Sequence, residues 1–510
     1  MDRAKSEDAI AEKGRPFTGA EYLESLRDGR EVYVYGERVK DVTTHPAFRN
    51  AAQTVAALYD MKADPALREE MTYEEDGGRH SIYFLRARSR EDLQRRMIGH
   101  RRIADFTYGL FGRSPDHVAS FITGMAMNLG ALLAPNAHPD NVLRYYKHAR
   151  DNDLYVAYAV LPPQAARDPN FYLKQNLPVP TLRVVREEDD GVIISGMKML
   201  ATGAVFVNDI WIGNVIPLAP EQKKESITCA IACNAPGLRL WSRKPMETDC
   251  TSEFDSPLSY RYDESDSMLL CDEVKVPWEK VFVHDDAILA REIYIKTPSH
   301  CFGNHQSNVR YWSKMRLIVG LCARIANATG ADQVPAVKET LGRISAQEAM
   351  IAGMVNGQIN AFESWPGGSE GYVCFNRRMM YGALDWCTQN YSRFIDDLRE
   401  LCGGGVFQMP ADISVMQDAE LAKQFQTFWQ TPQCDAVTRM KLFKLAWEMV
   451  GSEFAGRHQQ YEKFYAGAPF IIRNHSYRET DWASFTAIVD KLMAGYDYPN
   501  AETAGKRAAE

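Results

Sequence analysis

The stretch LRVVREEDDGVIIS, at residues 182–195, predicts a β-hairpin. Two runs rich in β-branched residues flank Asp190 and Gly191, and this arrangement is a strong signal for a tight turn between antiparallel strands. Further short β-rich runs follow at residues 205–212, 226–232 and 267–271, each bounded by proline, glycine or charge. This texture is typical of a small antiparallel barrel or sandwich.

Helical patterns lie on both sides of this β-rich part. The sequence before it has a mostly helical pattern. After Pro298 the spacing of apolar residues is again helical, in segments long enough for a bundle: 305–341, 343–362, 373–401 and 435–447. The pattern predicts an α+β protein. Its expected parts are a disordered tail at 1–14, an N-terminal α-helical domain at 15–150, a β-barrel or sandwich domain at 151–286, a C-terminal helical bundle at 287–495 and a flexible tail at 496–510.

Composition excludes several classes of protein. The 510 residues are 45% hydrophobic and 25% charged, which is ordinary for a globular protein, and a formal net charge of −8 argues against a nucleic-acid surface. No apolar run reaches the length of about 20 residues that a membrane span needs. The charged N-terminus lacks the apolar core of a secretory signal. We therefore expect a cytoplasmic protein whose ten cysteines, between Cys229 and Cys434, are reduced and buried.

A second informative stretch is GRSPDH, at residues 112–117. Before it, apolar residues at 93, 97, 104, 108 and 111 predict one helix face, with Ser89 as the N-cap and Asp92 three residues later. A helix that stops at Gly-Arg before Ser-Pro presents a fixed cation at a turn, with an imidazole four residues on. From this stretch alone two interpretations stay open: an ordinary helix end with a solvated arginine, or an anion-binding corner of an active site.

Common catalytic and cofactor motifs are absent. The sequence contains no G-x-G-x-x-G opening a βαβ unit, no P-loop, no H-E-x-x-H and no G-x-S-x-G. Cys229 and Cys233 lie in an apolar strand pattern, so we expect core cysteines rather than metal ligands, and no metal site is predicted. An enzyme with this sequence would therefore bind its cofactor on a scaffold other than a Rossmann fold.

Several longer strings together resemble one family. They are RPFTG at 15–19, GREVYVYGERV at 29–39, TTHPAF at 43–48, GRSPDH at 112–117, PLSYRYDE at 257–264, VPWE at 276–279 and GSEFAGRH at 451–458. In this order, over most of the chain, they resemble the oxygenase components of 4-hydroxyphenylacetate 3-monooxygenases. The resemblance implies a fold like that of acyl-CoA dehydrogenases, with a helical domain, a β-domain and a C-terminal four-helix bundle, and a homotetramer.

The resemblance also implies a chemistry. A separate NAD(P)H:flavin reductase would supply reduced FAD, with FMN as the alternative flavin. This chain would bind the reduced flavin and O2, and a flavin C4a-hydroperoxide would transfer one oxygen atom to a phenolic ring. This attack is electrophilic, so an ionised phenol reacts better than a neutral one. Because a free phenol has a pKa of about 10, the site needs a cation and a base.

The resemblance assigns substrate-binding roles to individual residues. Arg113 would hold the phenolate oxygen through charge-assisted hydrogen bonds. His117 stands where the 4-hydroxyphenylacetate enzymes carry tyrosine, as in the branch that acts on chlorinated and nitrated phenols. His305, in FGNHQ at residues 302–306, would be the general base, with the nearby residues His300 and Cys301 as weaker candidates. The predicted substrate pocket also includes Tyr158 and Asn214.

The resemblance likewise implies flavin contacts. Thr202 would hydrogen-bond the N5 edge of the flavin and limit the loss of hydrogen peroxide. The other predicted contacts are Tyr158, Ala159, Val160, Gln164, Arg457, Tyr465, Ala466 and Gly467. A buried structural role for Arg457 is an equally open interpretation.

One position departs from the family. Tyr158 stands where the family commonly has histidine, and a tyrosine donates a hydrogen bond but cannot be a cation. A halo- or nitro-substituted phenol and an aromatic N-heterocycle both stay open as substrates. A radical dehydratase of the 4-hydroxybutyryl-CoA type would need a Cys-x-x-x-Cys pair in the N-terminal domain, and no cysteine precedes Cys229. No motif argues for an acyl-CoA dehydrogenase, and a non-catalytic flavin-binding homologue is the remaining alternative.

Overall fold

Helix α4 (Arg90–Phe106) begins where the sequence predicts and ends earlier. The Ser89 side chain accepts a hydrogen bond from the backbone N–H of Asp92, which is the predicted cap. The helix does not continue toward residue 111, because Tyr108 and Gly109 adopt left-handed φ angles of 53° and 67°. Tyr108 is consequently exposed, and it does not belong to the apolar face on which the sequence pattern placed it.

The computed structural model describes residues 14–365 and 371–496. Before residue 155 most of the chain is helical, as predicted. The helices there are α1 (Gly19–Ser25), α2 (Arg49–Ala63), α3 (Arg68–Met71), α4, α5 (Pro115–Ala126) and α6 (Pro139–Asp151).

Two sheets form the β-rich part. The first has the strand order β2-β1-β10-β11-β7-β6 and the second has the order β12-β9-β8-β5. The strands are β1 (Val32–Val34), β2 (Glu37–Val39), β5 (Val156–Ala159), β6 (Arg183–Glu188), β7 (Gly191–Thr202), β8 (Asp209–Ile212), β9 (Thr228–Ala232), β10 (Leu238–Ser242), β11 (Asp266–Pro277) and β12 (Val281–Val283). Strands β6 and β7 pair antiparallel, with Glu188 opposite Gly191, so the hairpin predicted from the sequence is present. Short helices α7 (Pro169–Lys174) and α8 (Ser259–Tyr262) lie in the connections, and β3 (Thr72–Glu75) with β4 (Gly78–Ser81) forms a separate hairpin.

The β-rich part differs from the prediction in two respects. Strands β1 and β2 come from the region predicted as helical, and they extend the larger sheet because β1 pairs with β10. Their hairpin turns at Tyr35 and Gly36, whose φ angles of 51° and 79° suit a tight two-residue turn. The sheets are also not wholly antiparallel, because β1 with β10 and β5 with β8 are parallel pairs.

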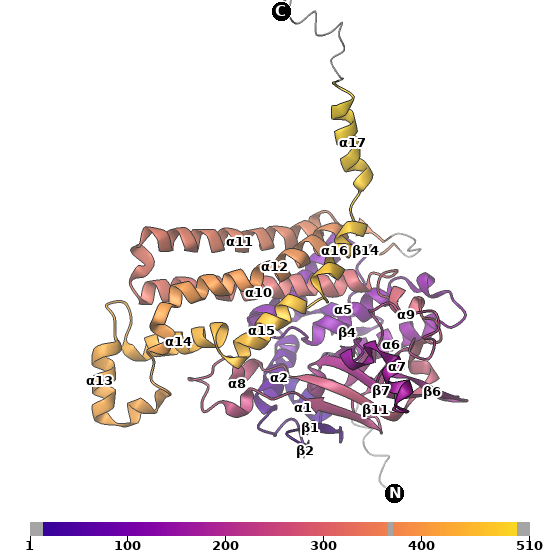
Figure 1. Cartoon of the computed structure of the whole chain (residues 1–510), viewed down its shortest axis with the longest axis horizontal. Helices are drawn as coiled ribbons and strands as arrows, with labels where there is room; N and C mark the ends of the chain where they lie inside the picture. The colour runs from indigo at the N-terminus through magenta and orange to yellow at the C-terminus, as the bar shows by residue number, and fades with distance from the viewer. Residues whose placement is uncertain (1–13, 366–370, 497–510) are drawn as a thin grey trace, which may run out of the picture.

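A long helical bundle follows, and Figure 1 shows it extending over and beyond the sheets. The predicted helix at 305–341 is in fact two helices, because Gly330 adopts a φ of 73° and Pro335 starts a new helix. The elements are α9 (Leu289–Glu292), α10 (Ser299–Ala328), α11 (Pro335–Asn360), β13 (Glu363–Ser364), β14 (Val373–Cys374), α12 (Arg377–Cys402), α13 (Ala419–Trp429), α14 (Ala436–Val450), α15 (Glu453–Phe464), α16 (Pro469–Arg478) and α17 (Trp482–Met493).

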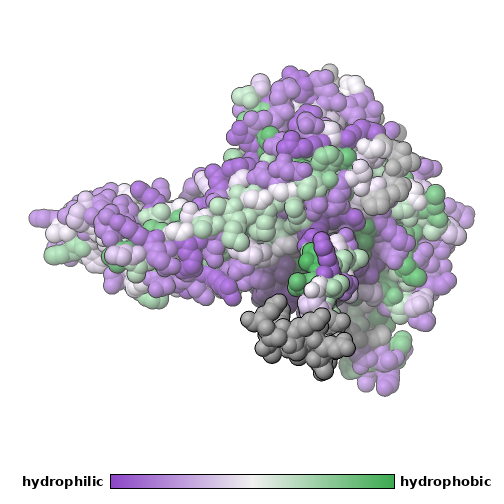
Figure 2. Space-filling model, turned by 90° about the horizontal axis from the view of Figure 1, so that it is seen from above, coloured by the Kyte–Doolittle hydropathy of each residue, from purple (hydrophilic) through white to green (hydrophobic). Residues whose placement is uncertain are grey.

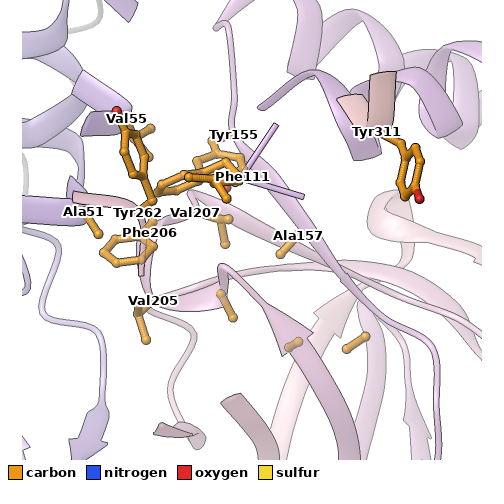
Figure 3. Packing of buried hydrophobic residues seen from close by; sticks show 14 of the residues in the cluster. Ala51, Val55, Phe111, Tyr155, Ala157, Val205, Phe206, Val207, Tyr262 and Tyr311 are labelled. Carbon is orange, nitrogen blue, oxygen red and sulfur yellow. The ribbon is translucent and has the colours of Figure 1, made fainter. Parts of the chain in front are cut away.

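One hydrophobic core joins the three parts. Figure 3 shows Val55 of α2, Phe111 from the turn after α4, Phe206 and Tyr262 converging on one another, and the same cluster continues into the bundle through Tyr311. All ten cysteines are free thiols, and eight of them are buried, including Cys229 and Cys233 in the core as predicted. Within the described ranges, no helix has both the length and the apolar character that a membrane crossing requires.

Candidate active site

The turn between α4 and α5 is fixed by groups from distant parts of the chain. The buried Glu264 carboxylate accepts hydrogen bonds from the backbone N–H groups of Gly112, at 2.9 Å, and Arg113, at 3.0 Å. Tyr155 Oη donates to the Arg113 carbonyl at 2.5 Å, and Tyr465 Oη donates to the Gly112 carbonyl at 3.0 Å. A Cβ atom on Gly112 would lie 1.9 Å from Tyr461 Oη, so only glycine fits here. The predicted turn is therefore a rigid corner.

Among the described residues, the Arg113 side chain has no carboxylate as an ion-pair partner. Its Nη1 donates to His117 Nε2 at 2.5 Å and its Nη2 donates to the Tyr465 carbonyl at 2.9 Å, with Cζ 4.2 Å from the centroid of the Tyr465 ring. Within the described ranges, no carboxylate forms an ion pair with this half-buried guanidinium. Desolvation opposes its charge, but the neighbouring tyrosines and Glu264 outweigh that effect and raise the pKa of Arg113. The cation is therefore permanent, and we call it uncompensated because none of the described carboxylates forms an ion pair with it.

His117 is a neutral imidazole. Burial lowers its pKa well below the ordinary value, and the adjacent Arg113 charge lowers it further. Since Nε2 accepts the hydrogen bond from Arg113, the single ring proton belongs on Nδ1. This Nδ1 atom is buried and has no hydrogen-bond partner in the part of the chain that the structure describes. A buried N–H without a partner is costly, and a bound ligand would satisfy it.

Aromatic rings line the side of the corner that carries Arg113 and His117. The Tyr158 ring on β5 lies 5.5 Å from the His117 ring and 5.4 Å from the Phe121 ring, measured between centroids. Phe121 packs onto Gly303 of α10, where a Cβ atom would lie 1.9 Å from Phe121 Cε2. The hydroxyl of the half-buried Tyr158 makes no hydrogen bond to any described residue. We refer to His117, Phe121, Tyr158 and Tyr465 as the aromatic wall.

His305 lies outside this wall. It is fully buried on α10, its Nδ1 is 2.8 Å from Gln358 Oε1, and its ring stacks on Phe375 at a centroid distance of 3.5 Å. The neighbouring Gln306, by contrast, reaches the corner, because its Nε2 donates to Ser114 Oγ at 3.3 Å and to Asp116 Oδ1 at 3.2 Å. Helical geometry turns adjacent side chains about 100° apart, so these two residues face different neighbours. The structure thus does not bring His305 together with Arg113.

His300, the weaker candidate in the sequence, lies closer to the aromatic wall. Its half-buried ring is 5.9 Å from the Phe121 ring and 6.1 Å from the Tyr294 ring, between centroids. Its Nδ1 lies within hydrogen-bonding distance, 3.3 Å, of Tyr381 Oη. Burial lowers the pKa of His300 to about 4, so the imidazole is neutral near pH 7. The adjacent Cys301 is buried, and its Sγ contacts the Phe375 carbonyl, which is a structural role.

Thr202 and Arg457 meet at one carboxylate. Thr202 Oγ1 donates to Asp266 Oδ1 at 2.6 Å, and Arg457 donates to both oxygens of Asp266, at 2.9 and 3.0 Å. The remaining Arg457 nitrogen, Nη1, donates to Glu264 at 3.0 Å. Despite burial, Arg457 and Arg243 hold the pKa of Asp266 well below its usual range. All three donor nitrogens of Arg457 are therefore engaged, which favours the structural interpretation over a phosphate contact.

The other predicted residues fall into two groups. Ala159 and Val160 are buried beside Tyr158, and Ala466 and Gly467 directly follow Tyr465, so both segments flank the aromatic wall. Asn214 instead accepts a hydrogen bond from the buried Lys198 at 2.8 Å, and it donates to two backbone carbonyls of the β-domain. Gln164 is exposed. Neither Asn214 nor Gln164 contacts the Arg113 corner.

Sequence reasoning missed several residues that hold the corner. Phe121 lies one helical turn after His117, so the helical spacing of α5 could have indicated it. Glu264 ends the family string at residues 257–264, but no role was predicted for it. No local pattern shows that its carboxylate reaches residues 112 and 113. The positions of Tyr155 and Tyr461 in the sequence do not indicate that these residues contact the corner.

This combination of helical domain, two-sheet β-domain and helical bundle around an aromatic-walled corner defines an acyl-CoA dehydrogenase-like flavoprotein fold. Family models described as 4-hydroxyphenylacetate 3-hydroxylase N terminal and C terminal match residues 18–283 and 290–494. The chain therefore belongs to the 4-hydroxyphenylacetate 3-hydroxylase family.

Relatives and solved structures agree. The chain is 31% identical to a 4-hydroxyphenylacetate 3-monooxygenase oxygenase component from Pseudomonas aeruginosa, over 97% of this chain and 95% of that protein. It is 33% identical to the 4-nitrophenol 2-monooxygenase oxygenase component from a Rhodococcus species, over 90% and 88%. A crystal structure of the oxygenase component HpaB complexed with FAD and 4-hydroxyphenylacetate matches with a TM-score of 0.87 and 29% identity, over 94% of this chain and 98% of that one.

The dehydratase alternative shares the fold alone. An archaeal 4-hydroxybutyryl-CoA dehydratase from N. maritimus matches with a TM-score of 0.83 but only 20% identity, over 95% of this chain and 96% of that one. The predicted family, fold class and FAD cofactor are confirmed, and so is the enzyme class. The chain is a flavin-dependent aromatic monooxygenase.

Proposed function

We propose that this chain hydroxylates a substituted phenol, bound as its oxygen anion at Arg113, with reduced FAD delivered by a separate NAD(P)H:flavin reductase. One observation carries this proposal: a half-buried guanidinium that lacks a carboxylate partner within the described residues. A buried cation without a counter-ion favours the charged form of any acid placed beside it. The relatives support the substrate class, since one is named for 4-nitrophenol, and names such as "oxygenase component" support a separate reductase.

Each group at the corner has a distinct task in this proposal. Arg113 stabilises the phenolate oxygen, and the Nδ1–H of His117 supplies a second hydrogen bond to the substrate side. The Tyr158 hydroxyl orients the ring of the substrate. It is a neutral hydrogen-bond donor at the position where the family commonly has histidine. The aromatic wall packs against the substrate and excludes water from the reacting carbon.

The residues predicted to contact the flavin fit a reduced isoalloxazine. The Thr202 hydroxyl proton is committed to the Asp266 carboxylate at 2.6 Å, so its oxygen is left to accept a hydrogen bond. Reduced flavin carries a hydrogen on N5, whereas oxidised flavin presents a lone pair there. The segments 158–160 and 465–467 would hold the rest of the ring system. When bound, the reduced flavin supplies the activation of O2 for transfer to the aromatic carbon.

His300 suits the role of general base better than His305. His300 is half-buried and near Phe121, whereas the His305 ring is stacked on Phe375 and hydrogen-bonded to Gln358. Replacement of His300 by glutamine should lower the ratio of hydroxylated product to released hydrogen peroxide at least tenfold. The matched variant His305→Gln should keep that ratio. The reverse outcome would return the base assignment to His305.

A binding experiment without flavin tests the central proposal. 4-Nitrophenol is titrated with protein at a pH one unit below its own pKa, and the absorbance band of the phenolate is recorded. Arg113 should increase the ionised fraction of the bound ligand several-fold, and the Arg113→Met variant should lose this increase. A control variant at an exposed arginine, Arg38→Met, should behave as the wild type. An unchanged ionised fraction on the wild-type protein would exclude a phenolate clamp at Arg113.

We also propose a homotetramer in the cytoplasm, with FAD preferred over FMN. Ten free thiols support a reducing compartment. Two of the similar solved structures are complexes with FAD, which supports a preference for FAD over FMN.

A further inference from the structure

The hydroxyl of Tyr294 is a buried hydrogen-bond donor close to the aromatic wall. Tyr294 follows α9 and is 2% exposed. Its Oη accepts a hydrogen bond of 3.0 Å from Trp211 Nε1. Because an indole nitrogen only donates, this contact leaves the tyrosine proton unused, and no described residue accepts it. Burial raises the pKa of Tyr294, so the hydroxyl keeps this proton at neutral pH.

The second sheet places Tyr294 beside Tyr158. Trp211 on β8 pairs in register with Tyr158 on β5, and residues paired in this way point to the same face of a sheet. The Tyr294 hydroxyl, which is bonded to Trp211, therefore lies over the face that carries Tyr158. Gly213 keeps space for this hydroxyl, since a Cβ atom there would lie only 2.0 Å from Tyr294 Oη.

Tyr294 lies at the end of the aromatic wall that is remote from the corner. At the corner, the His117 ring contacts the rings of Phe121 and Tyr158. Phe121 in turn contacts His300, whose ring is 6.1 Å from the Tyr294 ring between centroids. A benzene ring that lies against Phe121 and Tyr158, with its oxygen at the corner, would therefore direct a substituent on its opposite side toward Tyr294.

Two arginines give this remote end a positive charge. After burial itself, the charges of Arg478 and Arg291 are what lower the pKa of His300. In the parts of the chain that the structure describes, neither arginine forms an ion pair with a carboxylate. Helix α16, which carries Arg478, lies on the upper side in Figure 1, and the view from above shows mostly hydrophilic residues (Figure 2). Since Arg478 is exposed, water and salt screen its charge, so the pair favours a negative group only moderately.

We propose that Tyr294 determines which substituted phenols this enzyme prefers, by donating a hydrogen bond to an oxygen of a nitro or carboxylate group on the ring. This inference rests on the proposed function, because it requires the phenol oxygen to lie at Arg113. Nitro and carboxylate groups share the feature that the hydroxyl recognises, an acceptor oxygen that carries negative charge. An alkyl group at the same position leaves the buried donor without a partner, which is unfavourable.

Specificity constants measured with reduced FAD and O2 test this proposal. For the wild type and Tyr294→Phe, kcat/KM is determined with 4-nitrophenol, with 4-hydroxyphenylacetate and with 4-methylphenol, which carries no acceptor group. In Tyr294→Phe, the ratio of kcat/KM for at least one acceptor substrate to that for 4-methylphenol should fall about tenfold. Differences in ionisation between the phenols cancel, because each ratio is compared with its own wild-type value. Ratios that all stay within about twofold of the wild type would overturn the proposal.

Two further variants separate recognition from packing. Tyr145→Phe removes another buried hydroxyl from the same hydrophobic cluster, one that donates to Asp209 at 3.1 Å, and should keep the wild-type ratios. Gly213→Ala places a methyl group against Tyr294 Oη and should lower the ratios in the same direction as Tyr294→Phe. If Tyr294→Phe does not fold, unchanged ratios in Gly213→Ala overturn the proposal. An equal loss in Tyr145→Phe would assign the effect to packing and would also overturn it.

The titration of 4-nitrophenol without flavin distinguishes this inference from the proposed function. Tyr294→Phe should still increase the ionised fraction of the bound ligand, because Arg113 is unchanged, while its Kd for 4-nitrophenol or 4-hydroxyphenylacetate rises about tenfold. A wild-type protein that does not increase the ionised fraction would refute the phenolate clamp. An increased ionised fraction together with unchanged Kd values in Tyr294→Phe would refute only the role of Tyr294.

Discussion

Two half-buried arginines, Arg113 and Arg457, both bind the Glu264 carboxylate but have opposite roles. Arg457 donates from all three of its side-chain nitrogens to the carboxyl groups of Glu264 and Asp266. Arg113 uses only its backbone N–H on Glu264, and its guanidinium meets a neutral imidazole and a carbonyl. A compensated buried cation holds the fold together, whereas an uncompensated one is ready for a ligand. The charge of the neighbours, rather than burial, separates the structural arginine from the binding one.

The largest expected effect belongs to the compensated arginine. Replacing Arg457 by alanine leaves the buried Glu264 carboxylate without its ion-pair partner and leaves Asp266 with Arg243 alone, and breaking a buried ion pair costs about 3–5 kcal/mol. The free energy of unfolding, measured by urea denaturation, should fall by that amount. Arg343→Ala, which removes a more exposed ion pair with Asp397, is the control and should cost about 1 kcal/mol or less. Equal losses for the two variants would contradict the assignment of Arg457 as a structural cation.

The buried ion pairs of Glu462 with Arg310 and Lys314 should make the stability of the fold depend on pH. Arg310 and Lys314 outweigh burial and lower the pKa of Glu462 to about 2, from an ordinary value of 4.5. A carboxylate with a lowered pKa stabilises the fold above its ordinary value, and this stabilisation is lost as the pH falls through the folded-state value. Stability should therefore decline between about pH 4.5 and 2, and Glu462→Gln should flatten this part of the curve. An unchanged slope in the variant would assign acid unfolding to other groups.

Replacing Arg113 should have the opposite balance of effects, with a small loss of stability and a large loss of substrate binding. Arg113→Met removes a charge without leaving a buried acid unpaired, so the free energy of unfolding should change by less than about 1 kcal/mol. Substrate binding should weaken about 10- to 100-fold, because a hydrogen bond to a charged group contributes about 1.5–3 kcal/mol. The Michaelis constant for a phenol, together with urea denaturation, measures both effects. A large loss of stability would place Arg113 in the same class as Arg457.

The smallest effect is expected at Tyr158. The Tyr158→Phe variant removes one neutral donor, which contributes about 0.5–1.5 kcal/mol, so kcat/KM should fall about 2- to 10-fold. The aromatic contacts with His117 and Phe121 are retained in this variant. Tyr158→Leu, which also removes the ring, should lose more. If the two variants are equally impaired, the ring rather than the hydroxyl orients the substrate.

Local signals predicted the fold where they were strong. The Ser89 cap, the hairpin at residues 188–191 and the helix–sheet–helix order all follow from short stretches of sequence. The pairing of β1 with β10 could not be predicted in this way. About 200 residues separate the two strands, and no short stretch of sequence indicates that they pair. The end of α4 was also missed, because Tyr108, which the pattern placed on the apolar face of the helix, adopts a left-handed φ of 53°.

The roles predicted for the site residues stay predictions, but the structure shows which of these side chains lie together. Arg113, His117, Tyr158 and Tyr465 come together as the resemblance implies. His305 does not reach the corner, whereas its neighbour Gln306 does, because adjacent residues of a helix face directions about 100° apart. The amide of Asn214 bonds Lys198 and two backbone carbonyls within the β-domain, which its position in the sequence did not indicate.

The hydrogen bond from Arg113 to the Tyr465 carbonyl has a consequence for synthesis. A ribosome releases the N-terminus first, so the arginine must wait for a segment 352 positions downstream before its orientation is fixed. A nascent or prematurely terminated chain that ends before this tyrosine lacks the group that directs the guanidinium. Such a fragment should bind no phenolate, so the chain becomes competent to bind its substrate only after residue 465 has been synthesised.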